Sequence, residues 1–463
     1  MKLPNEKTGI FLLNEKQVKA HIQKRKPRVC VIGLGRVGLP ATIAFALKGF
    51  HSIGVDINQS LVDSVNRGKV NLKDEPELDK LLKRVKKGYL RATTNTKTAV
   101  AESEIILLCL PTPLNTSTNE PDYSYLESAC KELGSLNKGS MICVESTVSP
   151  GIIEDLIIPA IEETSGLRAG IDFGIASCPE RVNPSSIIRD LYKVPRIIGG
   201  INAKSTNIAA SLYEHVFGIQ IIKVKNCMTA NAVKLTENIF RYINIAYVTE
   251  LAFLFEKLGI DIREVIKACE TKYNFVAHYP SIGVGGPCLP VNMYQLLRTA
   301  SMSKSDLHLL DVARRINESM PLRIVDSVEQ LLSRVGKSLN NSTVTVLGVT
   351  YKPNVADTRI SPVEVIMNQL KVKGAKVRVY DPMIRTEEIF SCKVEKDYMA
   401  AVNGSDAILI GTPHTKFSKL NFKRMIEKMN SPSVILDPTG FLADKLKKYN
   451  ITYGSIGEGL QGK

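Results

Sequence analysis

The sequence predicts an α/β protein in which two doubly wound parallel-sheet domains are joined by a central region of long helices. In the first half of the chain, short apolar runs alternate with helical stretches, as in a parallel sheet covered by helices on both faces. These runs lie at 28–32, 51–55, 105–110, 142–145 and 173–177. Residues 228–258 then contain neither Pro nor Gly and are followed by Gly259, which is a normal end for a long helix.

A second series of strand, turn, helix and strand begins at Thr343. We expect strands at 343–347 and 376–380, a helix at 362–372, and further strands at 407–410 and 434–436. Gly348 supplies the turn after the first of these strands. Because this order repeats that of the first half, the sequence predicts two Rossmann-like domains.

The composition excludes several classes of protein. The 463 residues are 44% hydrophobic and 23% charged, as is usual for globular proteins. The longest apolar run, Ile105–Leu110, is too short to span a bilayer, and the apolar patch at 10–13 is too short for a secretory signal. The nine cysteines show no metal-like spacing, and Cys30, Cys109 and Cys143 lie in apolar strands as buried thiols would. We therefore expect a cytoplasmic protein with no disulfide framework, no metal and no membrane partner.

The formal net charge of +15 fits two interpretations. One is a basic, well-solvated surface, and the other is an affinity for polyanionic ligands such as nucleotides or nucleotide sugars. A nucleic-acid partner is not expected. The basic cluster Lys24-Arg25-Lys26 is short, Trp is absent, and no nucleic-acid-binding module is recognisable.

A dinucleotide-binding fingerprint follows the first predicted strand and reads Gly33-Leu34-Gly35-Arg36-Val37-Gly38. The first glycine permits a tight turn, the second lets a pyrophosphate approach the backbone at a helix N-terminus, and the third lets helix and strand pack closely. Asp56 ends the next strand, where a carboxylate can accept hydrogen bonds from ribose hydroxyls and would repel a 2′-phosphate. The cofactor is therefore expected to be NAD.

Polar turns follow three further strands of the first half, at the edge where ligands bind in parallel sheets. They are Pro111-Thr112-Pro113, Glu145-Ser146-Thr147 and Pro179-Glu180-Arg181. Any one of these turns alone is most often an ordinary loop.

A glycine- and proline-rich loop holds one cysteine, in the sequence Ile282-Gly283-Val284-Gly285-Gly286-Pro287-Cys288-Leu289-Pro290. This bent backbone makes the sulfur of Cys288 approachable. On the predicted helix at 228–258, Asn231, Lys234, Asn238 and Arg241 fall within an arc of about 80°. On periodicity alone, that stripe is as well explained by solvent exposure as by a functional site.

Taken together, these motifs resemble those of the UDP-glucose/GDP-mannose dehydrogenase family over residues 28–440. The remaining matches are the segment 234–246 (KLTENIFRYINIA), Tyr351-Lys352-Pro353 and Asp357-Thr358-Arg359-Ile360-Ser361-Pro362. The resemblance implies oxidation of the C6 alcohol of a nucleotide sugar to a uronic acid by two molecules of NAD⁺. A cysteine thiolate forms a thiohemiacetal and then a thioester on the way.

The resemblance also implies four regions: a polar N-terminal extension at 1–27, an NAD-binding Rossmann domain at 28–215, a central helical dimerisation region with the catalytic loop at 216–325, and a C-terminal UDP-sugar-binding domain at 326–463. A homodimer or higher homo-oligomer is expected. Whether residues 1–26 are disordered or pack on the NAD domain stays open, and His414 is assigned no role.

By position in the motifs, Cys288 resembles the nucleophile and Lys234 the lysine that stabilises an oxyanion or handles a proton. Asn238 resembles the residue that positions oxygen or water, while Thr147 and Glu180 resemble the groups that complete thioester hydrolysis.

The resemblance and the fingerprint together assign two sets of ligands. The expected NAD ligands are Gly33, Gly35, Arg36, Val37, Gly38, Asp56, Thr112 and Thr147. The expected substrate ligands are Glu180, Arg181, Lys234, Asn238, Arg241, Gly285, Lys352 and Arg359, the last reaching across a dimer.

Two residues depart from the family pattern. Asn292 stands where the family usually has an Asp four residues after the cysteine, and an amide cannot ionise or take a proton. Either Glu180 acts as the base alone, or the second half-reaction is slowed, or the site binds without full turnover. Pro287 is the second departure, at a position where relatives often have His or Ser.

Phe240-Arg241 and Asn244-Ile245-Ala246 resemble a stretch of the UDP-N-acetylmannosamine and UDP-N-acetylglucosamine dehydrogenases, which favours a UDP-N-acetylhexosamine. A UDP-glucose 6-dehydrogenase and a nucleotide-sugar-binding protein with impaired turnover are the alternatives. An epimerase or a hydroxyacid dehydrogenase would share the cofactor, but the second domain and the cysteine loop argue against both.

Overall fold

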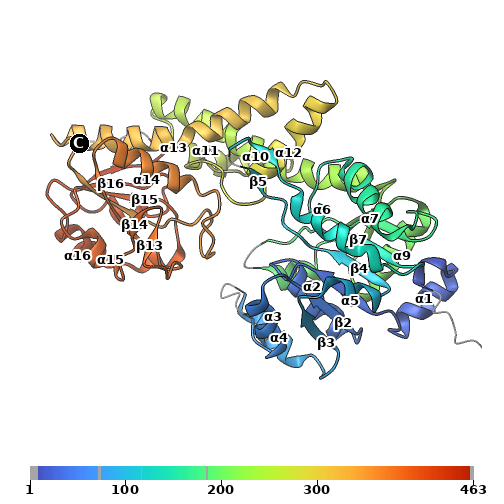
Figure 1. Cartoon of the computed structure of the whole chain (residues 1–463). Coiled ribbons are helices and arrows are strands. Elements are labelled where there is room, and N and C mark those ends of the chain that lie inside the picture. The colour runs from blue at the N-terminus through green and yellow to red at the C-terminus, as the bar shows by residue number, and fades with distance from the viewer. Residues whose placement is uncertain (1–8, 71–74, 116, 184–185, 459–463) are drawn as a thin grey trace, which may run out of the picture. The chain divides into compact units, whose positions relative to one another are not determined.

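A computed structural model describes residues 9–70, 75–115, 117–183 and 186–458 (Figure 1). The chain divides into two compact units. The first unit comprises Met1–Glu237 and Tyr294–Ser303, and the second comprises Asn238–Met293 and Lys304–Lys463. Each unit is built around its own mainly parallel sheet, so the predicted α/β class with two Rossmann-like domains is confirmed.

The first unit holds an eight-stranded sheet with the order β10-β9-β8-β7-β4-β1-β2-β3. Its strands are β1 (Val29–Ile32), β2 (Ser52–Val55), β3 (Leu90–Thr93), β4 (Ile105–Leu108), β7 (Met141–Val144), β8 (Gly174–Ser177), β9 (Arg196–Gly200) and β10 (Ile221–Lys223). All neighbours run parallel except β8 and β9. The central strands are buried along their whole length, which explains why they read as unbroken apolar runs.

The connections of the first unit are mostly helical. They are α1 (Glu15–Gln23), α2 (Gly38–Leu47), α3 (Gln59–Asn66), α4 (Pro76–Arg84), α5 (Thr96–Ala101), α6 (Ser124–Lys131), α7 (Ile158–Ser165), α8 (Ile187–Leu191) and α9 (Ala203–Phe217), with a short hairpin of β5 (Leu114–Asn115) and β6 (Glu120–Pro121). Two further helices, α10 (Cys227–Leu258) and α12 (Leu289–Met302), have residues in both units.

The second unit holds a five-stranded, fully parallel sheet with the order β12-β11-β15-β16-β17. Its strands are β11 (Thr343–Leu347), β12 (Lys376–Tyr380), β15 (Ala407–Ile410), β16 (Val434–Leu436) and β17 (Thr452–Gly454), beside a hairpin of β13 (Glu388–Ile389) and β14 (Cys392–Lys393). Its helices are α11 (Ile262–Cys269), α13 (His308–Arg334), α14 (Pro362–Val372), α15 (Tyr398–Val402), α16 (Phe422–Glu427) and α17 (Ala443–Leu446).

The N-terminal segment packs on the first unit, which answers the question that the sequence left open for its described residues. Asn14 caps α1 by accepting a hydrogen bond from Gln17 N at 3.0 Å. Phe11, Val18 and Ile22 are buried in the same hydrophobic cluster as residues of α9. This segment therefore contributes to the core of the first unit.

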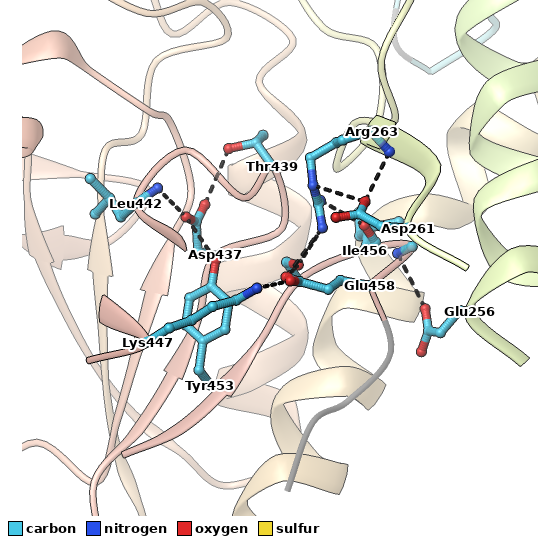
Figure 2. A network of polar contacts seen from close by, with 12 residues as sticks. Glu256, Asp261, Arg263, Asp437, Thr439, Leu442, Lys447, Tyr453, Ile456 and Glu458 are labelled. Carbon is cyan, nitrogen blue, oxygen red and sulfur yellow. Dashed lines mark hydrogen bonds and ion pairs between the residues drawn. The ribbon is translucent and has the colours of Figure 1, made fainter. Parts of the chain in front are cut away.

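A polar network fixes the end of the second sheet (Figure 2). Asp437, which follows β16, accepts hydrogen bonds from Leu442 N at 2.6 Å and from the Tyr453 hydroxyl at 3.3 Å. Arg263, at the start of α11, contacts Asp261 and Glu458 at 3.2 Å each. The network ties the chain after β17 to the start of α11 and to the loop after β16.

Among the described residues, no helix combines the length and the apolar character that crossing a bilayer requires. The described residues include all nine cysteines, none of which is in a disulfide. Cys30, Cys109 and Cys143 are buried thiols, as predicted.

Candidate functional site

The glycine turn between β1 and α2 contains two glycines required by packing and one that faces open space. Gly33 has a φ of +93°, and a Cβ there would lie 2.6 Å from Cys109 O. A Cβ on Gly38 would lie 1.8 Å from Gly33 O. By contrast, a Cβ on Gly35 would meet no atom within 4 Å. The backbone at Gly35 is therefore accessible to a ligand, as a pyrophosphate site requires.

Asp56 closes this turn from the end of β2. Its carboxylate accepts hydrogen bonds from Leu34 N and from Asn58 N, both at 2.9 Å. Val37 precedes α2, and among the described residues no side chain caps this helix. Leu39 N donates to Gly35 O at 3.2 Å and Pro40 has no N–H, so an anion at this end of α2 would depend on the N–H groups that precede Leu39. The half-buried Arg36 lies in the same turn.

The turns after β4 and β7 are hydrogen-bonded to each other. Thr112 Oγ1 donates to Thr147 O at 2.8 Å. Ser146 Oγ accepts from Leu110 N at 2.8 Å and donates to Leu110 O at 2.8 Å. Thr112 and Thr147 are therefore brought together at the carboxyl ends of two neighbouring strands, next to the glycine turn after β1.

A buried ionic group underlies the turn after β8. Glu145 accepts a hydrogen bond of 2.5 Å from the Tyr213 hydroxyl and lies 3.5 Å from the guanidinium of Arg196. The guanidinium also lies over the Tyr213 ring, 5.4 Å from its centroid. Glu180 N donates to Glu145 O at 3.3 Å, so the backbone links this group to Glu180.

Burial raises the pKa of Glu180 to about 7. The positive charges of Lys234 and Arg196 oppose this rise, and the negative charge of Glu145 adds to it. Lys234 is itself buried. A carboxyl with this pKa can accept or donate a proton near neutral pH.

Arg181 takes part in a structural ion pair. Its guanidinium binds both carboxylate oxygens of Glu237 and donates to Pro195 O at 2.5 Å. Its assignment as a substrate ligand stays a prediction.

In the second unit, the cysteine loop packs against the segment that follows Tyr351. Gly286, with a φ of +91°, donates its N–H to Ile360 O at 3.2 Å. A Cβ on Gly285 would lie 2.5 Å from Ile360 O, so this position requires glycine. The loop ends at Cys288, which is exposed and directly precedes α12.

Arg359 lies within electrostatic reach of Cys288. The pKa of Arg359 is raised chiefly by hydrogen bonds to Asp357, and the charges of Tyr351 and Cys288 act in the same direction. Asp357 is buried, whereas more than half of the Arg359 side chain is exposed. Arg359 can therefore contact a ligand while Asp357 holds it in place.

Two asparagines connect α10 with the start of α12. Asn238 Nδ2 donates to Asn292 Oδ1, and Asn292 N donates to Cys288 O at 2.8 Å. Asn292 is buried, with 3% of its surface exposed.

The predicted site residues are divided between the two units. The first unit holds the glycine turn, Asp56, Thr112, Thr147, Glu180, Arg181 and Lys234. The second unit holds Asn238, Arg241, Gly285, Cys288, Asn292, Lys352 and Arg359. Arg241 is exposed, and Lys352 is half-buried.

Sequence reasoning missed Arg196 and Tyr213. Tyr213 lies in a helix of ordinary composition, and the one available signal for Arg196 was an arginine that opens an apolar run, Arg196-Ile197-Ile198.

Comparison with known proteins gives the same family in three parts of the chain. Sequence profiles of the UDP-glucose/GDP-mannose dehydrogenase family match residues 27–217 (NAD binding domain), 228–319 (central domain) and 345–444 (UDP binding domain).

The UDP-N-acetyl-D-mannosamine dehydrogenase of Pyrococcus horikoshii is 37% identical over 429 residues, which cover 90% of this chain and 98% of that protein. A solved structure of UDP-D-ManNAc dehydrogenase from the same organism superimposes with a TM-score of 0.86 at 35% identity, covering 93% of this chain and 99% of that one. The NDP-N-acetyl-D-galactosaminuronic acid dehydrogenase of Ralstonia nicotianae is 32% identical and covers 90% of this chain and 96% of its own length. The chain therefore belongs to the UDP-glucose/GDP-mannose dehydrogenase family and is an NAD-dependent nucleotide-sugar dehydrogenase.

Proposed function

We propose that this enzyme oxidises the C6 hydroxyl of a UDP-N-acetylhexosamine to the uronic acid, with Cys288 as the covalent nucleophile. The names of the relatives above, all of which act on N-acetylated sugars, support the sugar class. UDP-N-acetylmannosamine is the first candidate and UDP-N-acetylglucosamine the second.

The position of Cys288 is the observation that carries the proposal. Its thiol is exposed, follows a loop that admits only glycine at two positions, and precedes a helix of 14 residues. The positive end of a helix stabilises an anion, so an anionic sulfur is favoured at this point. Such a sulfur can add to the carbon of a sugar aldehyde.

The proposed reaction consumes two NAD⁺ and one water. The C6 alcohol first loses a hydride and a proton and becomes an aldehyde. The Cys288 thiol adds to this aldehyde, and the thiohemiacetal loses a second hydride and a proton to give a thioester. Water then cleaves the C–S bond, which releases the carboxylate and restores the thiol.

The remaining catalytic residues handle protons and charge. Lys234 stabilises the oxyanions that form at C6. Glu180 takes a proton from the attacking water, which Thr147 positions. Asn238 orients the reacting oxygen, and Asn292 holds Asn238 through their hydrogen bond.

The residues around the glycine turn fit NAD, which accepts the hydride when bound. Gly33, Gly35 and Gly38 shape the backbone that receives the pyrophosphate, with Arg36 and Val37 between them. Asp56 would receive the ribose hydroxyls, and Thr112 and Thr147 would complete the set of NAD ligands.

The sugar nucleotide is held by the remaining predicted ligands. Lys352 and Arg359 supply positive charge for the diphosphate, and Gly285 contributes through the backbone of the cysteine loop. Arg181 and Arg241 complete the proposed set.

We further propose a cytoplasmic homodimer with domains at 28–215, 216–325 and 326–463. Phe240, Tyr247 and Leu254 recur every seven residues on α10, and about half of the surface of each is exposed. A stripe of this kind suits a second copy of the chain. Light scattering should give twice the 51.0 kDa chain mass, and a monomer at micromolar concentration would refute the dimer.

The test is a panel of UDP-sugars: N-acetylmannosamine, N-acetylglucosamine, N-acetylgalactosamine and glucose. Two NADH per sugar and a uronic acid by mass spectrometry are expected with an N-acetylhexosamine. Activity confined to UDP-glucose would overturn the sugar assignment, and tight binding of a UDP-sugar without NADH would indicate a binding protein.

Replacing Cys288 by Ser should abolish acid formation, because a hydroxyl is a poorer nucleophile at neutral pH. Cys269→Ser, a half-buried thiol in the same unit, is the matched control and should retain activity. Uronate production by the Cys288→Ser variant would show that Cys288 is not the nucleophile.

A further inference from the structure

In each sheet, the strand that comes first in the chain ends in the same kind of turn. Gly33 follows β1 with a φ of +93°, and Gly348 follows β11 with a φ of +87°. In each unit the next residue donates its N–H to an aspartate at the end of the neighbouring strand, to Asp56 at 2.9 Å and to Asp381 at 2.7 Å. The second unit therefore repeats the cofactor turn of the first.

The repeat extends to the next strand on the other side. Cys109 N donates to the last residue of β1 at 2.9 Å, and Gly411 N donates to the last residue of β11 at 2.9 Å. Counting three residues on from each, His414 stands at the position of Thr112, which is a predicted NAD ligand. A residue of unassigned role thus occupies a ligand position of the repeat.

The second unit differs from the first because a buried side chain, that of His414, occupies the position of the predicted ligand. His414 is fully buried, and its Nε2 lies 3.0 Å from Asp381 Oδ2, whereas Asp56 is half-buried. The open glycine of the first unit, Gly35, corresponds to the buried Thr350. The second unit therefore has no room for a dinucleotide at this turn.

His414 also holds the loop that carries Lys352. Its Nδ1 accepts the N–H of Asn354 at 2.9 Å, so Nδ1 is unprotonated and Nε2–H donates to Asp381. Asn354 has a left-handed backbone with a φ of +62°, and its side chain accepts from Thr415 N at 3.1 Å. The Thr350 hydroxyl donates to Lys352 O at 2.9 Å. The loop is thus fastened on both sides of Lys352.

We propose that His414, held by Asp381, is a positioning residue for the sugar nucleotide, because it fixes the loop at 350–354 from which Lys352 reaches the diphosphate. This inference rests on the proposed function through the assignment of Lys352.

The roles of the two imidazole nitrogens of His414 can be tested separately by substitution. His414→Leu removes both. His414→Asn keeps an oxygen near the position of Nδ1, where it can accept the Asn354 N–H, and loses the donor to Asp381. Tyr453→Phe is the control, since it removes one hydrogen bond to the buried Asp437 of the same sheet and leaves the loop at 350–354 alone (Figure 2).

His414→Leu should raise the KM for the UDP-sugar and the Kd for UDP about tenfold, with kcat and the KM for NAD⁺ within about twofold of the wild type. His414→Asn should recover most of this loss. Amide hydrogen exchange should accelerate at 349–357 in His414→Leu and stay slow in β11. Tyr453→Phe should lower the melting temperature without changing either KM.

An unchanged KM and unchanged exchange at 349–357 in His414→Leu would overturn the proposal. So would equal losses for both substrates that follow the loss of stability, since a purely structural role predicts that pattern. If the His414→Leu variant does not fold, the same measurements on His414→Asn, compared with Tyr453→Phe, test the proposal.

A failure of the proposed function can be distinguished from a failure of the proposed role of His414. A wild-type enzyme that oxidises no UDP-N-acetylhexosamine refutes that function, while UDP calorimetry and hydrogen exchange still decide the role of His414. If the wild type does not bind UDP at millimolar concentration, the positioning role is refuted as well.

Discussion

Glu180 is the residue whose surroundings matter most for the proposed chemistry. One of its carboxylate oxygens is buried and has no hydrogen-bond partner among the described residues. Lys234 and Arg196 provide nearby positive charge. Near neutral pH the carboxyl is therefore present in both its protonated and its deprotonated form. This suits a base that takes a proton and later returns it.

The pH dependence of the rate should follow Glu180. Because burial raises its pKa to about 7 and a base must be deprotonated, kcat/KM for the UDP-sugar should fall tenfold per pH unit well below pH 7. Glu180→Gln should lose this acidic limb along with most of the rate. Stopped-flow NADH formation from pH 5.5 to 9 is the measurement, and a limb that survives in Glu180→Gln would assign it to another group.

The same carboxyl should reduce stability at alkaline pH. Its folded-state pKa is raised above the unfolded value, so its stabilising contribution is complete below pH 4.5 and is lost as the pH rises through about 7. Glu180→Gln should then stabilise the protein by about 3 kcal/mol at pH 8 and by about 1 kcal/mol at pH 5. Thermal unfolding at both pH values tests this, with the exposed Glu127→Gln as the control that should change little. Equal shifts at the two pH values would contradict it.

The residue types of the candidate site were accessible from sequence, but their contacts were not. Motif and context selected Asp56 and Cys288 as candidates, whereas Thr147 and Glu180 were selected through the family resemblance. The pairing of Arg181 with Glu237 could not be foreseen, because it depends on how two segments 56 residues apart in the chain pack.

At the scale of elements, the strands of the second sheet were predicted best. β11, β12, β15 and β16 have the predicted bounds, because each is an alternating or continuous apolar pattern directly followed by Gly or Asp. The edge strand of this sheet, β17, was missed. The antiparallel β9 and the edge strands β3 and β10 were missed. β3 and β10 are partly exposed and show no continuous apolar run.

The N-terminal helix was also missed, although its signals are present in the sequence. Asn14 and Gln17 form a capping box, and Val18 and Ile22 lie four residues apart on one face. Neither signal was recognised, because most residues of this segment are polar.

The glycine turn allows folding and cofactor binding to be separated. Gly38→Ala should destabilise the first unit, since its Cβ would lie 1.8 Å from the Gly33 carbonyl oxygen. Gly35→Ala should leave the melting temperature of the free protein within about 2 °C, because open space surrounds this position, yet raise the KM for NAD⁺ at least tenfold. Unfolding curves and NAD⁺ titrations of both variants are the measurements. Normal NAD⁺ affinity in the Gly35→Ala variant would show that the pyrophosphate does not bind at this turn.

At the scale of the whole molecule, each unit has hydrophobic clusters of its own. Among the described residues, three buried clusters consist of residues of the first unit and two consist of residues of the second unit. Each unit can therefore gain or lose stability on its own, and a ligand that binds one unit should stabilise that unit.

Calorimetry should consequently resolve two thermal transitions. NAD⁺ at one hundred times its Kd should stabilise the first unit by about 2.7 kcal/mol and raise one transition, while the other moves little. Phe11→Ala should lower that same transition, because deleting a buried phenyl ring costs about 3–5 kcal/mol, and Phe11 packs in the core of the first unit. Phe422→Ala, in a core of the second unit, is the matched variant and should lower the other transition. A single transition that both variants shift equally would mean that the two units unfold as one, and the N-terminal segment would then stabilise the whole enzyme.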